Sequence, residues 1–333
     1  MEELVSIGIA TRNRVSFLKD AVESALTQQC DRPYEVVLVD DASTDKNVKT
    51  YLDSLKNPKL RIIYRQYQGG EAATRNTIIQ NMKGSYVLWL DDDDCLQKHG
   101  LASQLDALGA HPEADVIYAN LLQTDASLAP VREYTYKDIP RHLQLHVMLF
   151  YCPFPNVGTL IRKSLFERCG LYDESFVVAP DYDFWVRAAL MGASFVHNNR
   201  VIYFYRAHGN NAALDNENDV FCEMNVRIVQ KLLSSVPLET LFPIYDWAKN
   251  REQSFGLAMS SLAAVFARYR HFDYALDVIR QGEEKSRSFE LRAMKALILK
   301  WAERQDEAWS VLEDAVIASN QPLFNILRMA GLR

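Results

Sequence analysis

Apolar runs and amphipathic segments alternate over roughly the first hundred residues of the chain. The runs are short, rich in β-branched residues and typical of strands; they lie at 4–10, 34–40, 60–64 and 85–90. Between them, apolar residues recur at helical spacing, as at Leu18, Ala21, Val22 and Ala25. This alternation predicts βαβ units in an α/β domain with a mostly parallel, Rossmann-like sheet.

The pattern changes twice further along the chain. Residues 98–215 mix a predicted helix at 98–109 and a strand at 114–118 with irregular aromatic stretches, and a helix begins near Asp181. Residues 216–333 predict an all-α C-terminal region, with one helix after another. Three segments are therefore expected: 1–97, 98–215 and 216–333.

The helical region contains a weak internal repeat. "RHFDYALDVIRQG" and "ERQDEAWSVLEDA" align with a 33-residue offset that places Ala275 over Ala308. A small residue at this point lets two antiparallel helices approach closely. The pattern resembles a tetratricopeptide repeat, whose usual period is one residue longer. A generic helical subdomain is the alternative.

Polar residues follow three of the predicted strands. Thr11 begins one such group, Asp40 and Asp41 form the second, and four aspartates at 91–94 form the third. Ligands of parallel sheets bind at the carboxyl ends of the strands. Four adjacent carboxylates repel one another, and a divalent cation would relieve that repulsion. A solvated acidic loop that caps a helix is the alternative interpretation.

Composition narrows the class of protein. The formal net charge is −6, and no run of basic residues suggests a nucleic-acid partner. The five cysteines are scattered without a CxxC pair, which indicates a reduced intracellular chain and no structural zinc site. No signal-peptide pattern or long apolar stretch is present, so a cytoplasmic protein is expected. The aromatic stretch 147–155 leaves peripheral association with the inner face of the membrane as an alternative.

Five motifs occur in order along the first 210 residues. They are "VSIGIATRNR", "YEVVLVDDASTD", "GGEAATRNTIIQNMKGSYVLWLDDDD", "RKSLFERCGLYDESFVVAPDYDFWVRAALMGASF" and "YRAHGNN". Together they resemble the inverting family 2 glycosyltransferases of GT-A fold. The resemblance implies a nucleotide-sugar-binding half at 1–97 and an acceptor-binding half at 98–215. It does not extend to the helical region.

The resemblance implies a metal-dependent transfer of a sugar from a nucleotide diphosphate to an acceptor hydroxyl, in polysaccharide or glycoconjugate synthesis. The metal would be Mn²⁺ or Mg²⁺, which oxygen ligands suit. Asp93 is the expected metal ligand, Asp91 contacts the metal or the ribose, and His208 reaches the metal or the diphosphate. Asp92 and Asp94 would contact the donor sugar or support the metal ligands.

The nucleotide-sugar would contact further residues near the strand ends. The resemblance implies that Asp41 accepts a hydrogen bond from the base, with Ser43 beside it, and that Arg75 binds the diphosphate. A surface ion pair is the alternative role for Arg75. Three residues after the first strand line the same edge: Thr11, Asn13 and Arg14. Two residues depart from the family pattern: Ala10 replaces a proline and Arg12 an aromatic residue, which puts ordinary base stacking in doubt.

Asp181 is the expected general base for the acceptor hydroxyl. The family has Glu-Asp here, and Pro180 replaces the glutamate. Asp183 is a second candidate, and simple stabilisation of a helix N-terminus is the alternative role for Asp181.

The expected partners follow from this reaction. The donor is a nucleotide-diphosphate sugar, with a UDP-sugar favoured, and the acceptor is a glycan or a lipid-linked or protein-linked group. Residues 216–333 would contact a protein partner or a second copy of the chain. A catalytically degenerate GT-A protein that acts as a scaffold through this helical region is the alternative function.

Overall fold

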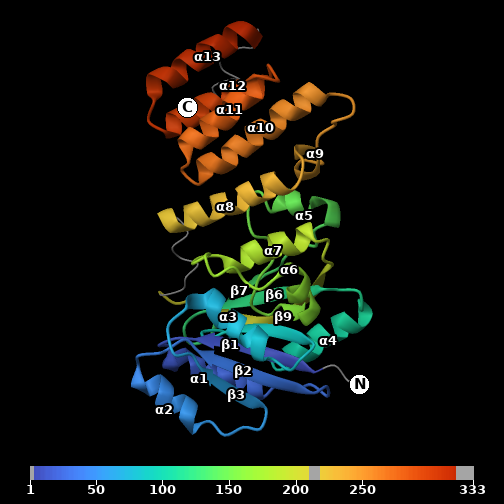
Figure 1. Ribbon diagram of the computed structural model, residues 1–333, viewed down its shortest axis with the longest axis vertical. Helices are drawn as coiled ribbons and strands as arrows, with labels where there is room; N and C mark the ends of the chain where they lie inside the picture. Colours follow the sequence, from blue (N-terminus) through green and yellow to red (C-terminus); the bar gives the residue numbers. More distant parts are fainter. Residues whose placement is uncertain (1–3, 210–217, 320–333) are drawn as a thin grey trace. The chain divides into compact units, whose positions relative to one another are not determined.

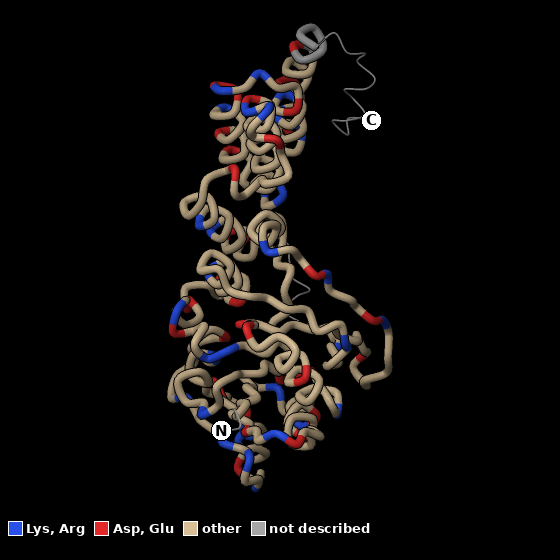
Figure 2. The backbone as a smooth tube through the Cα atoms, turned by 90° about the vertical axis from the view of Figure 1, so that its right-hand side faces the viewer, with Lys and Arg blue, Asp and Glu red and all other residues tan. Residues whose placement is uncertain are grey.

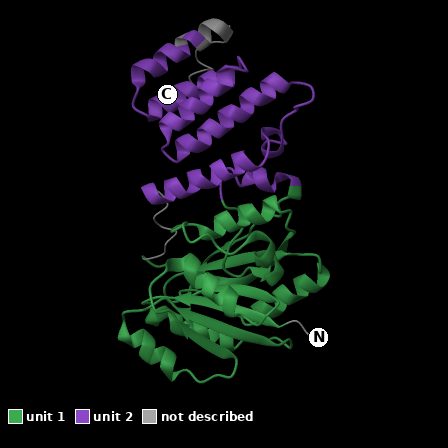
Figure 3. Cartoon of the chain, viewed as in Figure 1, with its two compact units in different colours: residues 1–141, 152–215 green, residues 142–151, 216–333 purple. Residues whose placement is uncertain are grey.

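The computed structural model describes residues 4–209 and 218–319. The chain divides into two compact units (Figure 3): unit 1 comprises residues 1–141 and 152–215, and unit 2 comprises 142–151 and 216–333. Residues 142–151 therefore group with the helical unit, although the sequence pattern placed them within segment 98–215. The expected boundary at 215/216 lies outside the described residues.

Unit 1 is built on one mixed sheet (Figure 1). The strand order is β3-β2-β1-β4-β8-β6-β9-β5, and β7 pairs with β6. The strands are β1 (Val5–Thr11), β2 (Tyr34–Asp40), β3 (Leu60–Tyr64), β4 (Tyr86–Asp91), β5 (Cys95–Leu96), β6 (Val116–Thr124), β7 (Pro130–Tyr134), β8 (Leu160–Arg162) and β9 (Phe195–Arg206). Strands β1 to β4 are parallel to one another, whereas the short strands β5, β7 and β8 pair antiparallel with their neighbours.

Helices cover the sheet and bury its apolar side chains. They are α1 (Val15–Leu26), α2 (Lys46–Ser54), α3 (Gly70–Asn81), α4 (Gly100–Ala110), α6 (Lys163–Cys169) and α7 (Pro180–Leu190), while α5 (Arg141–Val147) runs from unit 1 into unit 2. The predicted apolar positions of α1, such as Leu18 and Val22, lie in one core with Ile7 and Leu38. Their burial supplies the main driving force for this arrangement.

Helices form the regular structure of unit 2 over its described residues, which contain no strand. Its helices are α8 (Asp219–Ser235), α9 (Leu238–Leu241), α10 (Arg251–Arg268), α11 (Phe272–Glu283), α12 (Phe289–Trp301) and α13 (Gln305–Ser319). Helices α10 and α11 pack together, as do α12 and α13, and α12 also contacts α10 and α11. Ala275 in α11 and Ala308 in α13 are both buried, in keeping with the aligned small residues of the repeat.

Positions occupied by Lys or Arg and by Asp or Glu alternate with other residues along the helices of unit 2 (Figure 2). Among residues 4–209 and 218–319, none of the helices is both long and apolar enough to span a bilayer.

Candidate active site

The polar residues that follow β1, β2 and β4 meet at one edge of the sheet. The register pairs Thr11 with Asp40 and Ala10 with Asp91, so three strands end side by side. The Asp41 N–H donates to the Thr11 carbonyl at 2.9 Å, which continues the contact beyond the strands. Parallel pairing therefore brings together side chains that lie 80 residues apart in the sequence.

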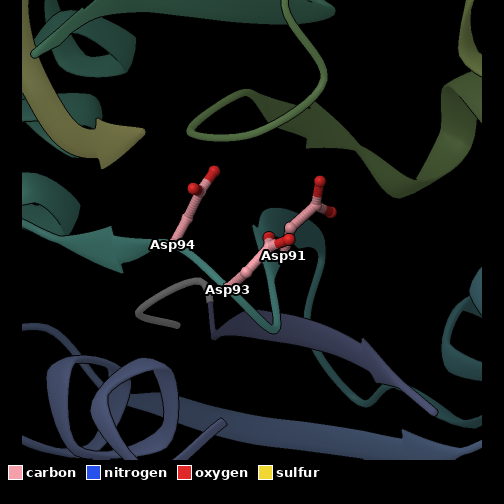
Figure 4. A group of neighbouring side chains, drawn as sticks. All are labelled: Asp91, Asp93 and Asp94. Carbon is pink, nitrogen blue, oxygen red and sulfur yellow. The ribbon is translucent and has the colours of Figure 1, made fainter. Parts of the chain in front are cut away.

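Three carboxylates gather in the turn after β4. Asp91, Asp93 and Asp94 each offer an oxygen, and these oxygens lie within 4.8 Å of one another. Figure 4 shows the three side chains on the same side of the turn. Burial raises the pKa of Asp94, and the neighbouring Asp91 and Asp93 raise it further. Such a set of hard oxygen donors fits Mg²⁺ or Mn²⁺, which would offset the repulsion.

Asp92 bonds to one residue at the end of β1 and to one in the loop after it. Its carboxylate accepts from Thr11 Oγ1 at 2.7 Å and from Arg14 Nη1 at 3.1 Å. Burial raises the pKa of Asp92 to about 7, against the opposing effect of Arg14. These contacts join the loop after β1 to the turn after β4. Asp92 is thus engaged by the protein, and it does not belong to the group of three carboxylates.

Two basic side chains share one oxygen of Asp93. Asp93 Oδ2 lies 2.6 Å from Arg14 Nη1 and 3.1 Å from His208 Nε2. His208 also stacks on the ring of Phe17 in α1, with ring centroids 4.7 Å apart. Arg14 remains partly accessible, with 37% of its side chain exposed. The structure thus brings Arg14 and His208 to the predicted metal ligand.

Arg75 is buried against carboxylates rather than open to solvent. It is 3% exposed, forms an ion pair with Glu71, and donates through Nη2 to Asp91 Oδ1 at 3.0 Å. Its guanidinium also lies 5.8 Å from the Trp89 ring centroid. These contacts tie α3 to the end of β4. The predicted diphosphate ligand therefore already has carboxylate partners within the protein.

Asp41 shapes the glycine turn that precedes α3. Its two carboxylate oxygens accept from the backbone N–H groups of Gly69 and Gly70, each at 2.9 Å. Gly70 has a φ of +81°, a conformation that favours glycine. Arg65 Nε lies 2.9 Å from Asp41 Oδ1 and adds an ion pair. The predicted base-binding carboxylate is thus held against this turn.

Asn13 and Ser43 connect the loops after β1 and β2. Ser43 Oγ donates to Asp40 and accepts from the Asn13 N–H at 2.9 Å. Asn13 Oδ1 in turn accepts from the N–H groups of Thr44 and Asp45. The positive φ of Asn13, 56°, turns the chain so that these bonds form.

Asp181 lies in the first turn of α7, one residue after Pro180. Burial raises the pKa of Asp181, and the positive charge of Arg75 opposes that rise. Because Arg75 also pairs with Asp91, Asp181 and Asp91 lie near the same cation. Asp183 is fully buried, and its Oδ2 accepts from Arg187 Nε at 2.8 Å within α7. Asp183, the second candidate base, therefore forms an ion pair within α7.

Two residues of this site, Glu71 and Arg206, had no expected role. Asp94 was expected to contact the donor sugar or to support the metal ligands, and its carboxylate lies with those of Asp91 and Asp93. Arg206 donates its backbone N–H to Asp94 Oδ1 at 2.9 Å, a contact between residues 112 positions apart. Arg206 lies in the quoted motif "YRAHGNN", which is the one signal that marks it.

The comparison with known families agrees with this geometry. Residues 6–170 match the model of glycosyl transferase family 2, which covers β1 to β4 and the four aspartates. Residues 6–170 form a glycosyl transferase family 2 domain. The predicted family is thereby confirmed.

Several curated proteins resemble this chain. An uncharacterized glycosyltransferase of Rickettsia typhi is 31% identical over 214 residues, which are 62% of this chain and 64% of that protein. One from Rickettsia prowazekii is 32% identical over 55% of this chain and 58% of its own length. The chain thus matches less than two thirds of either Rickettsia protein. The Escherichia coli UDP-Glc:alpha-D-GlcNAc-diphosphoundecaprenol beta-1,3-glucosyltransferase WfaP is 27% identical over 67% of this chain and 85% of its own.

Solved structures of similar fold include two complexes with nucleotide sugars. Staphylococcus aureus TarS 1-349 in complex with UDP-GlcNAc has a TM-score of 0.62 at 16% identity, covering 95% of this chain and 92% of that one. The mannosyltransferase PcManGT from Pyrobaculum calidifontis, in complex with GDP-Man and Mn²⁺, has a TM-score of 0.55 at 16% identity. The match covers 96% of this chain and 87% of that one. The likeness confirms the predicted GT-A domain followed by helices.

Proposed function

We propose that the chain transfers a sugar from a nucleotide-diphosphate donor to an acceptor hydroxyl with inversion at the anomeric carbon. The observation that carries this proposal is the group of Asp91, Asp93 and Asp94 at the carboxyl end of β4, in a family 2 domain. A UDP-sugar is the proposed donor. It is supported by the UDP-GlcNAc bound to TarS and by the UDP-Glc in the name of WfaP.

Asp93, Asp91 and Asp94 are the proposed ligands of Mn²⁺ or Mg²⁺, and Mn²⁺ is supported by its presence in the PcManGT complex. The ion would supply positive charge to the departing diphosphate. Arg14 and His208 both contact Asp93 and would add charge-assisted hydrogen bonds to the same phosphates. Arg75 has a different proposed role, because its contacts with Glu71 and Asp91 hold a metal ligand in place.

The donor's nucleoside would lie along the edge formed by β1 and β2. Asp41 and Ser43 are the proposed contacts of the base and ribose, and Asn13 positions Ser43. Thr11 and Asp92 would act together, since their hydrogen bond connects the loop after β1 to the metal-binding turn. These residues order the donor before reaction and thereby lower the entropic part of the barrier.

Asp181 is the proposed general base. Its carboxylate would take the proton of the acceptor hydroxyl as that oxygen bonds to the anomeric carbon. The bond from the anomeric carbon to the diphosphate oxygen breaks, and the diphosphate departs with the electron pair. A raised pKa suits this role, because a base is stronger when its conjugate acid is weaker.

The acceptor is proposed to be a glycan or a lipid-linked or protein-linked sugar, in polysaccharide or glycoconjugate synthesis. The lipid-linked choice is supported by the diphosphoundecaprenol acceptor in the name of WfaP. A lipid-linked acceptor would place the reaction in the cytoplasm at the inner face of the membrane. Unit 2 is the proposed contact with a protein partner or a second copy of the chain.

A donor-hydrolysis and transfer assay tests the proposal. The purified chain with Mn²⁺ should release the nucleoside diphosphate, UDP or GDP, from at least one donor in a panel of UDP-sugars and GDP-mannose. Asp93→Ala should abolish this release, while Asp106→Asn, an exposed carboxylate in α4, should leave it unchanged. If the wild-type chain hydrolyses and transfers none of these donors, and no nucleotide stabilises it, the enzymatic function is refuted and a scaffold function is favoured.

A further inference from the structure

Arg206 joins three separate elements at the candidate metal site. It is the last residue of β9 and only 3% exposed. Its backbone N–H donates to Asp94 Oδ1 at 2.9 Å, and its side-chain Nε donates to the Asp93 carbonyl oxygen at 2.9 Å. Arg206 therefore contacts Asp93 through its side chain and Asp94 through its main chain.

The other guanidinium nitrogens of Arg206 reach outside the turn. Nη2 donates to Asp20 Oδ2 of α1 at 2.7 Å, and Nη1 donates to the Ala126 carbonyl oxygen at 3.0 Å. The planar fork of arginine allows these bonds to form in different directions at once, which an ammonium group on a flexible stem cannot reproduce. Arg206 thereby connects the turn to α1 and to the segment between β6 and β7.

Phe17 of α1 supports this junction from one side. Its ring lies 4.8 Å from the Arg206 guanidinium carbon and stacks on His208. Asp20 is one turn further along the same helix, so α1 contacts Arg206 through both an aromatic ring and a carboxylate. The orientation of Arg206 is thus determined by side chains outside the carboxylate group.

We propose that Arg206 is the positioning residue of the metal site, holding Asp93 and Asp94 in a metal-binding arrangement through its anchor on Asp20. The inference rests on the proposed function, because it assumes that these carboxylates bind a divalent cation. Groups that orient metal ligands without touching the metal typically change metal affinity by about 10- to 100-fold when they are mutated. Arg206 is such a group, because its partners include the Asp93 carbonyl, the Asp94 carboxylate and the Asp20 anchor.

Titration of the full chain with Mn²⁺ alone, followed by water-proton relaxation, tests the inference. Arg206→Lys keeps the charge and removes the fork, so its Kd for Mn²⁺ should rise about 10- to 100-fold. Asp20→Asn leaves Arg206 in place but weakens its anchor, and a smaller rise in the same direction is expected. Arg162→Lys is the matched control, since Arg162 donates to the Ala114 and Pro112 carbonyls on another part of unit 1.

Thermal unfolding in EDTA separates positioning from general stability. Arg206→Lys and Arg162→Lys should both lower the melting temperature, whereas only Arg206→Lys should weaken Mn²⁺ binding. Equal Kd values for the wild type and folded Arg206→Lys would overturn the inference and leave the proposed function standing. If Arg206→Lys does not fold, an unchanged Kd in Asp20→Asn overturns it. A wild type that binds no Mn²⁺ would refute the metal site and this inference together.

Discussion

Arg14 Nη1 lies 2.6 Å from Asp93 Oδ2, so an arginine from the loop after β1 already neutralises the expected metal ligand after β4. The same nitrogen lies 3.1 Å from Asp92 Oδ1. Burial acts to lower the pKa of Arg14, but the charges of Asp92 and Asp93 outweigh it and raise the pKa overall. The protein thus carries its own cation beside the carboxylates that would bind Mn²⁺.

The ion pair between Arg14 and Asp93 should affect metal binding. Arg14→Met removes a positive charge next to Asp93, so Mn²⁺ alone should bind more tightly than it binds the wild type. In EDTA the variant should lose about 1 kcal/mol of unfolding free energy, a small value because Arg14 is partly exposed. Urea unfolding with and without Mn²⁺ measures both effects. Arg168→Met, which breaks a comparable 2.6 Å pair with Asp115, should lose stability without any change in Mn²⁺ affinity.

Asp181→Asn should separate donor binding from transfer. The amide cannot accept the proton of the acceptor hydroxyl, so the rate of transfer should fall by about 10²- to 10⁴-fold. Donor binding should persist, because the proposed donor contacts lie on other elements. Calorimetric titration with UDP in Mn²⁺ and a transfer assay give the two readings. Normal transfer by Asp181→Asn would mean that another group is the base.

The transfer rate should also depend on pH through Asp181. Burial raises its pKa above the ordinary aspartate value of about 3.9, so the carboxylate takes up a proton at a higher pH than an exposed aspartate does. As pH falls through this raised pKa, the proposed base is lost and the rate declines. A pH profile of kcat/KM should show this acid limb, and the residual rate of Asp181→Asn should lack it. An identical limb in both proteins would assign it to a different group.

Ala275 should be intolerant of a larger side chain. It is 0% exposed in α11, and a leucine there would overpack the helices of unit 2 at a cost of about 1–3 kcal/mol. Asp277→Leu places the same side chain on the exposed side of α11, where about 0.5 kcal/mol or less is expected. Urea unfolding of the two variants, followed by circular dichroism at 222 nm as helix content is lost, compares them. Equal stabilities would show that α11 does not need a small residue at this position.

Local patterns were sufficient to locate the first four strands and the helices between them. The apolar, β-branched run 36–39 lies in the middle of β2, because the centre of a strand buried on both faces must be apolar. The same patterns located the polar residues at the strand ends, and the family motifs identified Asp91 and Asp93. Strands β5 and β8 were not anticipated, since segments of two and three residues carry too little periodicity to be recognised.

The sequence by itself thus determined that four aspartates stand at the end of a central strand of a family 2 domain. Only the tertiary structure decided which of them face one another. Asp92 bonds to Thr11 at the end of β1, whereas the Asp94 carboxylate accepts from the backbone N–H of Arg206, 112 residues later. Side-chain direction in a turn depends on such distant partners, and their approach is set by strand pairing and helix packing rather than by neighbours in the chain.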